Sequence, residues 1–321
     1  MEDAARNAAQ KKRGSATLKL MRTNYSLYIM LLLPLAYFIT FRYIPMTNIV
    51  VAFKDYSIFK TVWESPWAQT GGSLDLFKYF KQAFKSAEFL RVLGNTITLN
   101  FLDLAFGFFF PVILALLLNE ITFRKFKRFT QTVLYMPHFL SWIIIYGMAA
   151  QIFAPQSGVI NIMLRNIGLG PIHFLDDKLL WIFTYVFLGI WQSAGYNTIV
   201  YLAAITGINP ELYEAAEVDG AGRLRKIVHI TLPGIRQTIV VMLILNMGRI
   251  LQISFDRPYA LGNTLVRSVA DVISTYVYRV GIVAQQFSLT TAVGLFQSVV
   301  CLIFLIGANI ITEKLGEKGI W

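Results

Sequence analysis

Six apolar runs, each close to the length of a membrane-crossing helix, follow one another along this chain. They cover residues 27–43, 95–118, 129–152, 179–205, 236–253 and 288–312. A helix needs about 20 predominantly apolar residues to cross about 30 Å of hydrocarbon, and in lipid its backbone groups must be satisfied within the segment. The pattern therefore predicts an all-α integral membrane protein, with a domain of six transmembrane helices over residues 26–312.

Both ends of the chain are polar. Residues 1–25 are rich in Lys and Arg and show almost no apolar periodicity, which is typical of a cytoplasmic tail, and residues 313–321 form a second short tail. The first apolar run lacks the shorter apolar core and the small-residue cleavage site of a signal peptide. We therefore expect it to remain in the protein as an anchor.

The distribution of basic residues predicts the orientation. Lys and Arg are about twice as dense in the two tails and in segments 119–130 and 206–236 as in segments 46–94, 153–178 and 254–287. Because positive loops stay on the cytoplasmic side, this bias places both termini and the segment around Glu214 in the cytoplasm.

Composition agrees with a membrane protein, since 56% of the 321 residues are hydrophobic and 14% are aromatic. A net charge of +11 raises the question of a nucleic-acid partner. The basic residues are spread between apolar runs and not gathered in one patch, so we expect membrane lipid and no nucleic acid. A single cysteine, Cys301, excludes a disulfide or a thiolate metal cluster within this chain.

The segment from Glu214 to Pro233 is a polar island between two apolar runs. Asn209 is a good helix cap, Pro210 suits the first helical position, and Gly220 can take the left-handed conformation that ends a helix. A second short amphipathic turn follows at residues 224–230. The pattern predicts a helix, a tight turn and a second helix across the mouth of the bundle, and physics alone leaves a solvated, helically capped loop as the alternative.

Three stretches of this island resemble a known motif. They are Glu214-Ala215-Ala216, Asp219-Gly220-Ala221-Gly222 and Ile230-Thr231-Leu232-Pro233. Together they resemble the EAA loop of ATP-binding-cassette (ABC) importer permeases, in the spacing of the carbohydrate-uptake group. We call residues 206–235 the EAA loop.

Further stretches extend the resemblance from about residue 25 to the end of the chain. They are Asn95-Thr96, Tyr135-Met136-Pro137, Phe255-Asp256, the segment 276–279 and the ending Ile320-Trp321. The last two are similar to the polysaccharide and complex-oligosaccharide branch, near the permeases for pectin-derived rhamnogalacturonan fragments.

The resemblance implies a type I ABC importer fold in which cytoplasmic coupling helices receive movement from a separate ATPase. In that scheme Ala215 and Ala216 allow a close seat against the ATPase, and Glu214 supplies a polar contact. Gly220 permits the turn next to Asp219, and Leu232-Pro233 form a rigid link to the fifth helix.

The resemblance also implies the partners. They are a second permease of similar fold, two ATP-binding subunits and an extracytoplasmic sugar-binding protein or lipoprotein. The chain itself contains no phosphate-binding Gly-x4-Gly-Lys-Ser/Thr loop, no His-Glu-x-x-His and no Gly-x-Ser-x-Gly. We therefore expect a non-catalytic subunit without its own cofactor or metal, with ATP and Mg²⁺ bound by the partner ATPase.

Polar groups inside the apolar runs are costly in lipid and usually face a cavity or another helix. The residues that we expect along a translocation path are Asn100, Asp103, Trp191, Gln192, Asn197, Asn246, Arg249, Gln252, Asp256 and Gln297. Thr96 shares one helical face with the first two. On a continuous helix Arg249, Gln252 and Asp256 lie within about 60° of one another and form a polar stripe.

Two uses compete for these residues. Amides, carboxylates and arginine can bind sugar hydroxyls, with Trp191 offering an apolar face to the ring. Alternatively Asp103 and Arg249 pair with each other and hold two helices together. If the sugar is acidic, Arg249 is the best single candidate for its carboxylate.

The segment 46–94 mixes aromatic residues with lysines. This mixture is compatible with sugar binding, but it is more typical of an interfacial helix at the lipid headgroups. The turn-rich segment 153–178 faces outward and is a candidate contact for an external delivery protein.

We therefore expect a permease subunit of an ATP-driven oligosaccharide importer in the bacterial cytoplasmic membrane, with an acidic, pectin-derived sugar as one form of the substrate. Two alternatives remain open. One is an importer permease for a different solute, such as glycerol phosphate or a peptide. The other is a membrane receptor or scaffold that docks a cytoplasmic partner without transporting anything.

Overall fold

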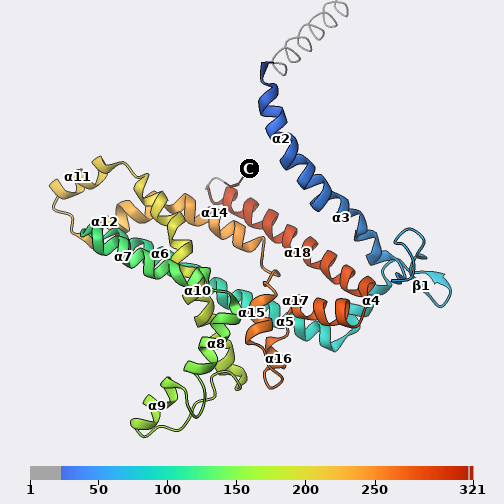
Figure 1. Cartoon of the computed structure of the whole chain (residues 1–321). Coiled ribbons are helices and arrows are strands. Elements are labelled where there is room, and N and C mark those ends of the chain that lie inside the picture. Colours follow the sequence, from blue (N-terminus) through green and yellow to red (C-terminus); the bar gives the residue numbers. More distant parts are fainter. Residues whose placement is uncertain (1–22, 317–318, 321) are drawn as a thin grey trace, which may run out of the picture.

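The computed structural model describes residues 23–316 and 319–320. Nearly all of the expected N-terminal tail lies outside these residues, as do three positions of the C-terminal tail, residues 317–318 and Trp321. The described chain is helical except for one small hairpin (Figure 1).

Four helical stretches are long and apolar enough to cross a membrane. The first joins α2 (Tyr25–Phe38), the π-helical η1 (Ile39–Tyr43), α3 (Ile44–Met46) and the 3-10 segment η2 (Thr47–Phe53). The second joins α5 (Ala87–Leu102), the π-helical η3 (Asp103–Gly107) and α6 (Phe109–Asn119). The other two are the single helices α10 (Lys178–Thr206) and α18 (Phe287–Lys314). The apolar runs 27–43, 95–118, 179–205 and 288–312 are thus confirmed as helical.

Two bent pairs qualify only when each is taken as one span. One is α7 (Arg124–Tyr135) with η4 (Met136–Phe139) and α8 (Trp142–Ile152), bent by 102°. The other is α12 (Arg223–Lys226), the π-helical η5 (Ile227–Thr231) and α13 (Leu232–Gly234), followed by α14 (Arg236–Met247) at 57°. The described residues therefore contain four candidate membrane spans, or up to six.

The remaining elements are short. The helices are α4 (Lys78–Lys85), α9 (Val159–Asn166), α11 (Pro210–Val218), α15 (Asp256–Leu261), α16 (Arg267–Ala270), α17 (Ile273–Tyr276) and η6 (Val277–Val283). The strands β1 (Gln69–Thr70) and β2 (Ser73–Leu74) pair antiparallel. This hairpin is a small departure from the all-α expectation.

The third apolar run, 129–152, is not one helix as expected. The α-helix ends at Tyr135 and continues as a 3-10 turn to Phe139, where Pro137 has no N–H to donate. The break follows at Leu140 and Ser141, whose backbone is extended. Ser141 then caps a new helix, and its side chain accepts a hydrogen bond from the Ile144 N–H. The sequence shows Pro137 and Ser141, but it does not show how far the direction changes.

The fifth run, expected to be helical over 236–253, ends early. Helix α14 stops at Met247, and Gly248 leads into a turn whose Arg249 N–H bonds back to the Asn246 carbonyl. Two side chains from neighbouring helices satisfy the carbonyls that this unwinding exposes. Asn100 donates to the Ile250 carbonyl at 2.8 Å, and Gln297 donates to the Leu251 carbonyl at 2.5 Å. Unwound backbone inside a bundle requires such partners.

The segment 46–94 folds into more than the interfacial helix expected from its composition. Lys54 is 4% exposed; its ammonium donates to the Val62 and Trp63 carbonyls and lies over the Trp63 and Trp67 rings. The aromatic and basic residues therefore build a small folded unit, which ends in the amphipathic α4. Ser288, at the start of α18, accepts from the Tyr56 N–H and donates to the Lys54 carbonyl.

Helix α10 lies at the centre of the packed part of the molecule. Its Trp181 and Tyr185 are 1% exposed and form a core cluster with residues of α5, α8 and α16. Further along, Gly195 lets the backbone of α7 approach closely, since a Cβ there would overlap the Leu134 carbonyl oxygen. By contrast, none of the α2 side chains is buried, and α2 projects away from the other helices (Figure 1).

We predict that Gly195→Ala destabilises the protein by about 1–3 kcal/mol, because the added methyl overlaps backbone that cannot move aside. Thermal unfolding of the purified full-length chain in detergent measures the effect. Gly294→Ala is the matched control: Gly294 also lies inside a long helix, but a Cβ there meets nothing within 4 Å. This control should gain up to about 1 kcal/mol from helix propensity. Equal behaviour of the two variants would contradict the close approach of α7 and α10.

A second prediction concerns Asp55. Burial alone would raise its pKa, but hydrogen bonds from Lys78 and Tyr79 outweigh that effect and hold the pKa below the usual 3.8. A lowered pKa stabilises the fold at pH values above 3.8, and this contribution is lost as the pH falls through the folded-state value. Asp55→Asn should therefore cost on the order of 1 kcal/mol at pH 7.

The difference between Asp55→Asn and the parent protein should shrink below about pH 4. Thermal midpoints of both proteins, recorded from pH 7 down to pH 3, check this. A difference that stays constant over this range would show that the Asp55 charge is not involved.

Candidate functional site

The EAA loop has the helix, turn and helix that the sequence predicts. The Asn209 side chain accepts from the Glu211 N–H, Pro210 occupies the first position of α11, and the helix ends before Gly220, whose φ is +73°. The left-handed conformation at Gly220 is the one that favours glycine. The three helical signals read from the sequence, at Asn209, Pro210 and Gly220, are therefore confirmed.

Two contacts that the sequence did not indicate hold α11 against the next helix. Lys226 forms an ion pair with Glu217 at 2.6 Å, and the hydroxyl groups of Tyr213 and Thr231 lie 3.0 Å apart. The hydrogen bond and the charge of Lys226 lower the pKa of Glu217. These pairs connect positions 9 and 18 residues apart, so α11 and the helix Arg223–Gly234 are held together.

Leu232 and Pro233 precede the fifth helix, α14. They lie at the end of the helix Arg223–Gly234, just before the 57° bend into α14. At the bend a Cβ on Gly234 would overlap the side chain of Ile208, which lies just after α10. Pro233 has no N–H to donate within this helix, and Gly234 is its last residue, so the helix ends just before α14 begins.

The EAA loop exposes large apolar side chains among its polar ones. No residue of α11 is buried, and Glu214, Ala215 and Asp219 are all exposed. Val218 and Leu224 are 89% and 76% exposed. Figure 1 shows α11 at one tip of the molecule, far from the hairpin end. A helix with no buried residue and with large apolar side chains exposed on either side of the turn that follows it is a candidate interaction surface.

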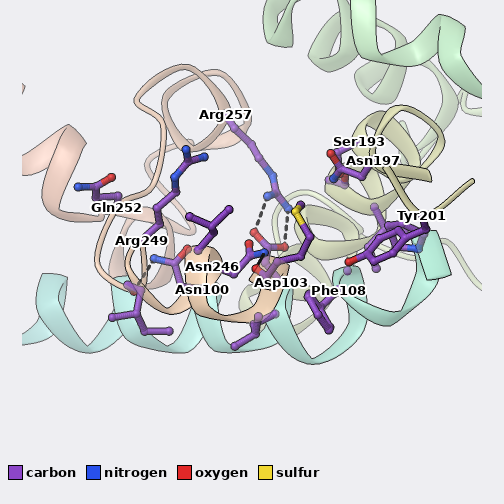
Figure 2. Close-up of a pocket in the computed structure, with 18 residues that line it drawn as sticks. Asn100, Asp103, Phe108, Ser193, Asn197, Tyr201, Asn246, Arg249, Gln252 and Arg257 are labelled. Carbon is purple, nitrogen blue, oxygen red and sulfur yellow. Dashed lines mark hydrogen bonds and ion pairs between the residues drawn. The ribbon is translucent and has the colours of Figure 1, made fainter. Parts of the chain in front are cut away.

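A second candidate site is a cavity of about 380 Å³ between α5–α6, α10 and the end of α14 (Figure 2). This size lies within the range of small-molecule pockets. Of the expected path residues, it brings together Asn100, Asp103, Asn197, Asn246, Arg249 and Gln252. Ser193, Tyr201 and Arg257 also line it, although sequence analysis did not select them.

Four expected path residues do not line this cavity. Gln297 donates to the Leu251 carbonyl, and Gln192 donates to the His138 carbonyl at 3.4 Å. Asp256 begins α15, so the helical stripe expected with Arg249 and Gln252 is absent: the helix has already ended at Met247. Trp191 lies on α10 outside the lining. Thr96, on the face shared with Asn100, is buried against the Ile273 N–H.

The expected pairing of Asp103 with Arg249 is also wrong. Asp103 pairs with Arg257, whose two terminal nitrogens reach its two carboxylate oxygens at 2.6 and 3.1 Å. The unwinding after Met247 is the reason, because it carries the chain to α15 and returns Arg257 across the cavity (Figure 2).

Arg257 contacts aromatic rings as well as Asp103. Its guanidinium lies 3.6 Å from the centre of the Tyr185 ring and 5.2 Å from that of Trp142, and it donates to the Tyr185 carbonyl. It also lies over Gly189, where a Cβ would overlap the guanidinium. The Asp103–Arg257 pair thus connects η3, α8, α10 and α15. In the sequence, the one feature that indicates a close contact here is Gly189, a glycine inside a long apolar run.

Within the part of the chain that the structure describes, no three His, Cys, Asp or Glu side chains gather so that they could hold a metal ion. The cavity instead presents amides, hydroxyls and three charged groups. Such a lining suits a ligand rich in hydroxyl groups, because these groups both donate and accept hydrogen bonds.

Comparison with known proteins gives a consistent result. The family model described as binding-protein-dependent transport system inner membrane component matches residues 107–316. Two proteins of Bacillus subtilis (strain 168) are each 43% identical to this chain. Protein LplB matches over 96% of this chain and 95% of its own length. The polygalacturonan/rhamnogalacturonan transport system permease protein YteP matches over 97% and 95%.

Two solved structures are also similar. One is a bacterial alginate ABC transporter in complex with an alginate pentasaccharide-bound periplasmic protein, with a TM-score of 0.84 and 38% identity over 94% of this chain and 99% of that chain. The other is a bacterial ABC transporter involved in the import of the acidic polysaccharide alginate. It has a TM-score of 0.83 and 39% identity over 92% and 98% of the two chains.

We predict that Gly189→Ala displaces Arg257 and costs about 1–3 kcal/mol of stability, because the new methyl occupies the place of the guanidinium. The same change in an Arg257→Ala background should be neutral or should gain up to about 1 kcal/mol from helix propensity. Thermal unfolding of the two single variants and the double variant gives the coupling between the positions. Additive effects would mean that Gly189 does not make room for Arg257.

Proposed function

Since this chain belongs to the family of binding-protein-dependent transport system inner membrane components, and so is the permease component of an ABC transporter in the cell membrane, we propose that it imports oligosaccharides, including acidic ones. The family supplies non-catalytic transporter subunits. The observation that carries the substrate proposal is the cavity, whose lining combines the exposed amides of Asn197 and Gln252 with Arg249.

The relatives support the acidic class. YteP is described as a permease for polygalacturonan and rhamnogalacturonan, and the two structural relatives belong to alginate transport. An acidic sugar needs a cation along its path, and arginine is the side chain best suited to bind a carboxylate. Arg249, exposed in the cavity, is our candidate for that contact.

The proposed architecture has six spans, counting each bent pair as one, with both termini in the cytoplasm. One chain forms half of the path, and a second permease of similar fold forms the rest. A pair of ATP-binding subunits docks on the cytoplasmic side, and an extracytoplasmic sugar-binding protein delivers the substrate.

The proposed coupling runs through the EAA loop. Helix α11 seats in a cleft of an ATP-binding subunit, with Ala215 and Ala216 allowing close approach and Glu214 making a polar contact. When ATP closes the two subunits, α11 moves with the cleft. The pairs Glu217–Lys226 and Tyr213–Thr231 transmit this movement to the helix Arg223–Gly234, and through its bend to α14. The exposed Val218 and Leu224 support docking at this surface.

The test compares Gly220→Val with Gly220→Asn in the reconstituted complex, with ATP inside the vesicles and the binding protein and labelled oligosaccharide outside. Valine is strained at φ +73°, at a cost of order 1–3 kcal/mol, whereas asparagine tolerates this conformation. We expect uptake to fall at least about tenfold with valine, since 1.4 kcal/mol is a factor of ten, and to be largely retained with asparagine.

Glu214→Ala should lower uptake as well, and co-purification of the ATPase is measured in parallel for all three variants. Loss of ATPase docking with unchanged sugar entry would overturn the proposed transport role. Absence of oligosaccharide uptake by the unmodified complex, with uptake of a phosphate ester or a peptide instead, would overturn the substrate class.

A further inference from the structure

Three charged side chains line the cavity: Asp103, Arg249 and Arg257. All the other lining residues are uncharged at neutral pH. The charge that a passing solute meets therefore depends on how these three groups are paired. Inside a bundle the effective dielectric constant is low, so a single unpaired charge has a large effect on an ionic solute.

Asp103 and Arg257 neutralise each other. The bidentate geometry matches the guanidinium fork to the carboxylate. The Arg257 side chain is 12% exposed, because Tyr185 covers one face and Trp142 lies near it. With its two terminal nitrogens bound to Asp103 and to the Tyr185 carbonyl, this arginine has little left to offer a ligand.

Arg249 differs from Arg257 in its exposure and, among the described residues, in its lack of a partner. It is exposed, and its side chain makes no hydrogen bond or ion pair with the residues that the structure describes. Figure 2 shows its guanidinium between Gln252 and the Asp103–Arg257 pair, without a dashed line to any neighbour. It is thus the unpaired cation among the lining residues.

We propose that Arg257 determines the charge specificity of this cavity: by neutralising Asp103, it leaves Arg249 as the net charge that a sugar carboxylate meets. The proposal rests on the proposed function and assigns a role to a residue that does not itself bind the substrate. Without Arg257, the Asp103 carboxylate would face the cavity, cancel the charge of Arg249 and repel an acidic sugar. Gly189 takes part because it provides the space in which Arg257 reaches Asp103.

The first experiment reads the charge of the cavity directly. Cys301 is the single cysteine of the chain and is buried, so Cys301→Ala removes the native thiol. Asn246→Cys then places a new thiol on the exposed cavity lining. In the assembled complex, this thiol reacts with an anionic and with a cationic methanethiosulfonate reagent of similar size. The ratio of the two rates, measured on the separated permease chain, reports the local potential.

Arg257→Gln should lower the anionic-to-cationic rate ratio on the order of tenfold, as expected for one charge unmasked within about 10 Å. Arg249→Gln should lower it similarly. Asp103→Asn should raise the ratio, since two arginines then face the cavity. The double variant Asp103→Asn with Arg257→Gln should return it to within about threefold of the parent, because Arg249 is again the net charge.

The Asp103→Asn and double variants keep the test decisive if Arg257→Gln alone does not assemble. A ratio that Asp103→Asn leaves unchanged, or that the double variant does not restore, overturns the proposal. In that case Arg257 only packs the helices together.

The second experiment measures specificity in the reconstituted complex. Uptake of a uronic-acid oligosaccharide is compared with uptake of the same oligosaccharide after its carboxyl groups are reduced to alcohols. Each variant's rate is divided by the parent rate for that substrate, which cancels the preference of the binding protein.

Arg257→Gln should lower relative uptake of the acidic sugar at least about fivefold more than that of the reduced sugar, and the double variant should remove this difference. A purely structural role would lower both substrates equally in both variants, which would overturn the specificity claim. Absence of any oligosaccharide uptake by the parent would instead refute the proposed function, while the thiol ratios would still report whether Arg257 masks Asp103.

Discussion

The structure depends on one requirement: a polar group placed inside an apolar helix bundle must find its partner within the protein. The fifth apolar run stops being helical at Met247, and its free carbonyls need donors. Asn100 from α5 and Gln297 from α18 supply them. The chain that emerges brings Arg257 to Asp103, and that ion pair fixes α15 against η3. The hydrogen bond from Arg257 to the Tyr185 carbonyl fixes α15 against α10. These contacts fix the unwound stretch and Arg257 in place, and both line the cavity.

The same requirement separates structural polar residues from those available to a solute. The amides of Gln297 and Asn100 donate hydrogen bonds to backbone carbonyls, and the charge of Asp103 is neutralised by Arg257. Arg249 and Gln252, on the unwound stretch itself, keep their side chains exposed. An interrupted helix thus creates both a need for internal partners and a short segment whose polar side chains reach a cavity. This combination suits a permease, which has to pass a polar solute through an apolar bundle.

Helix α11 of the EAA loop follows the opposite principle, since most of its side chains are exposed. Helix α11 buries none of its residues and displays Val218 to solvent. In the part of the chain that the structure describes, two polar side-chain pairs link α11 to another helix, and both lead to the helix Arg223–Gly234. A surface held to a single neighbour can move with whatever docks on it, and the bend before α14 is the point where such movement would enter the bundle.

Sequence alone determined the features that depend on local chemistry. Apolar length located the helical runs, Asn209, Pro210 and Gly220 set the bounds of α11, and the EAA motif indicated the family. Tertiary structure decided where runs of sufficient apolarity break, and which polar residues meet. Arg249 and Arg257 are only eight positions apart, and nothing local distinguishes the arginine that pairs with Asp103 from the one that faces the cavity. That choice depends on Gly189 and Tyr185, far away in the chain, because partners for buried charge are set by packing between helices and not by spacing along them.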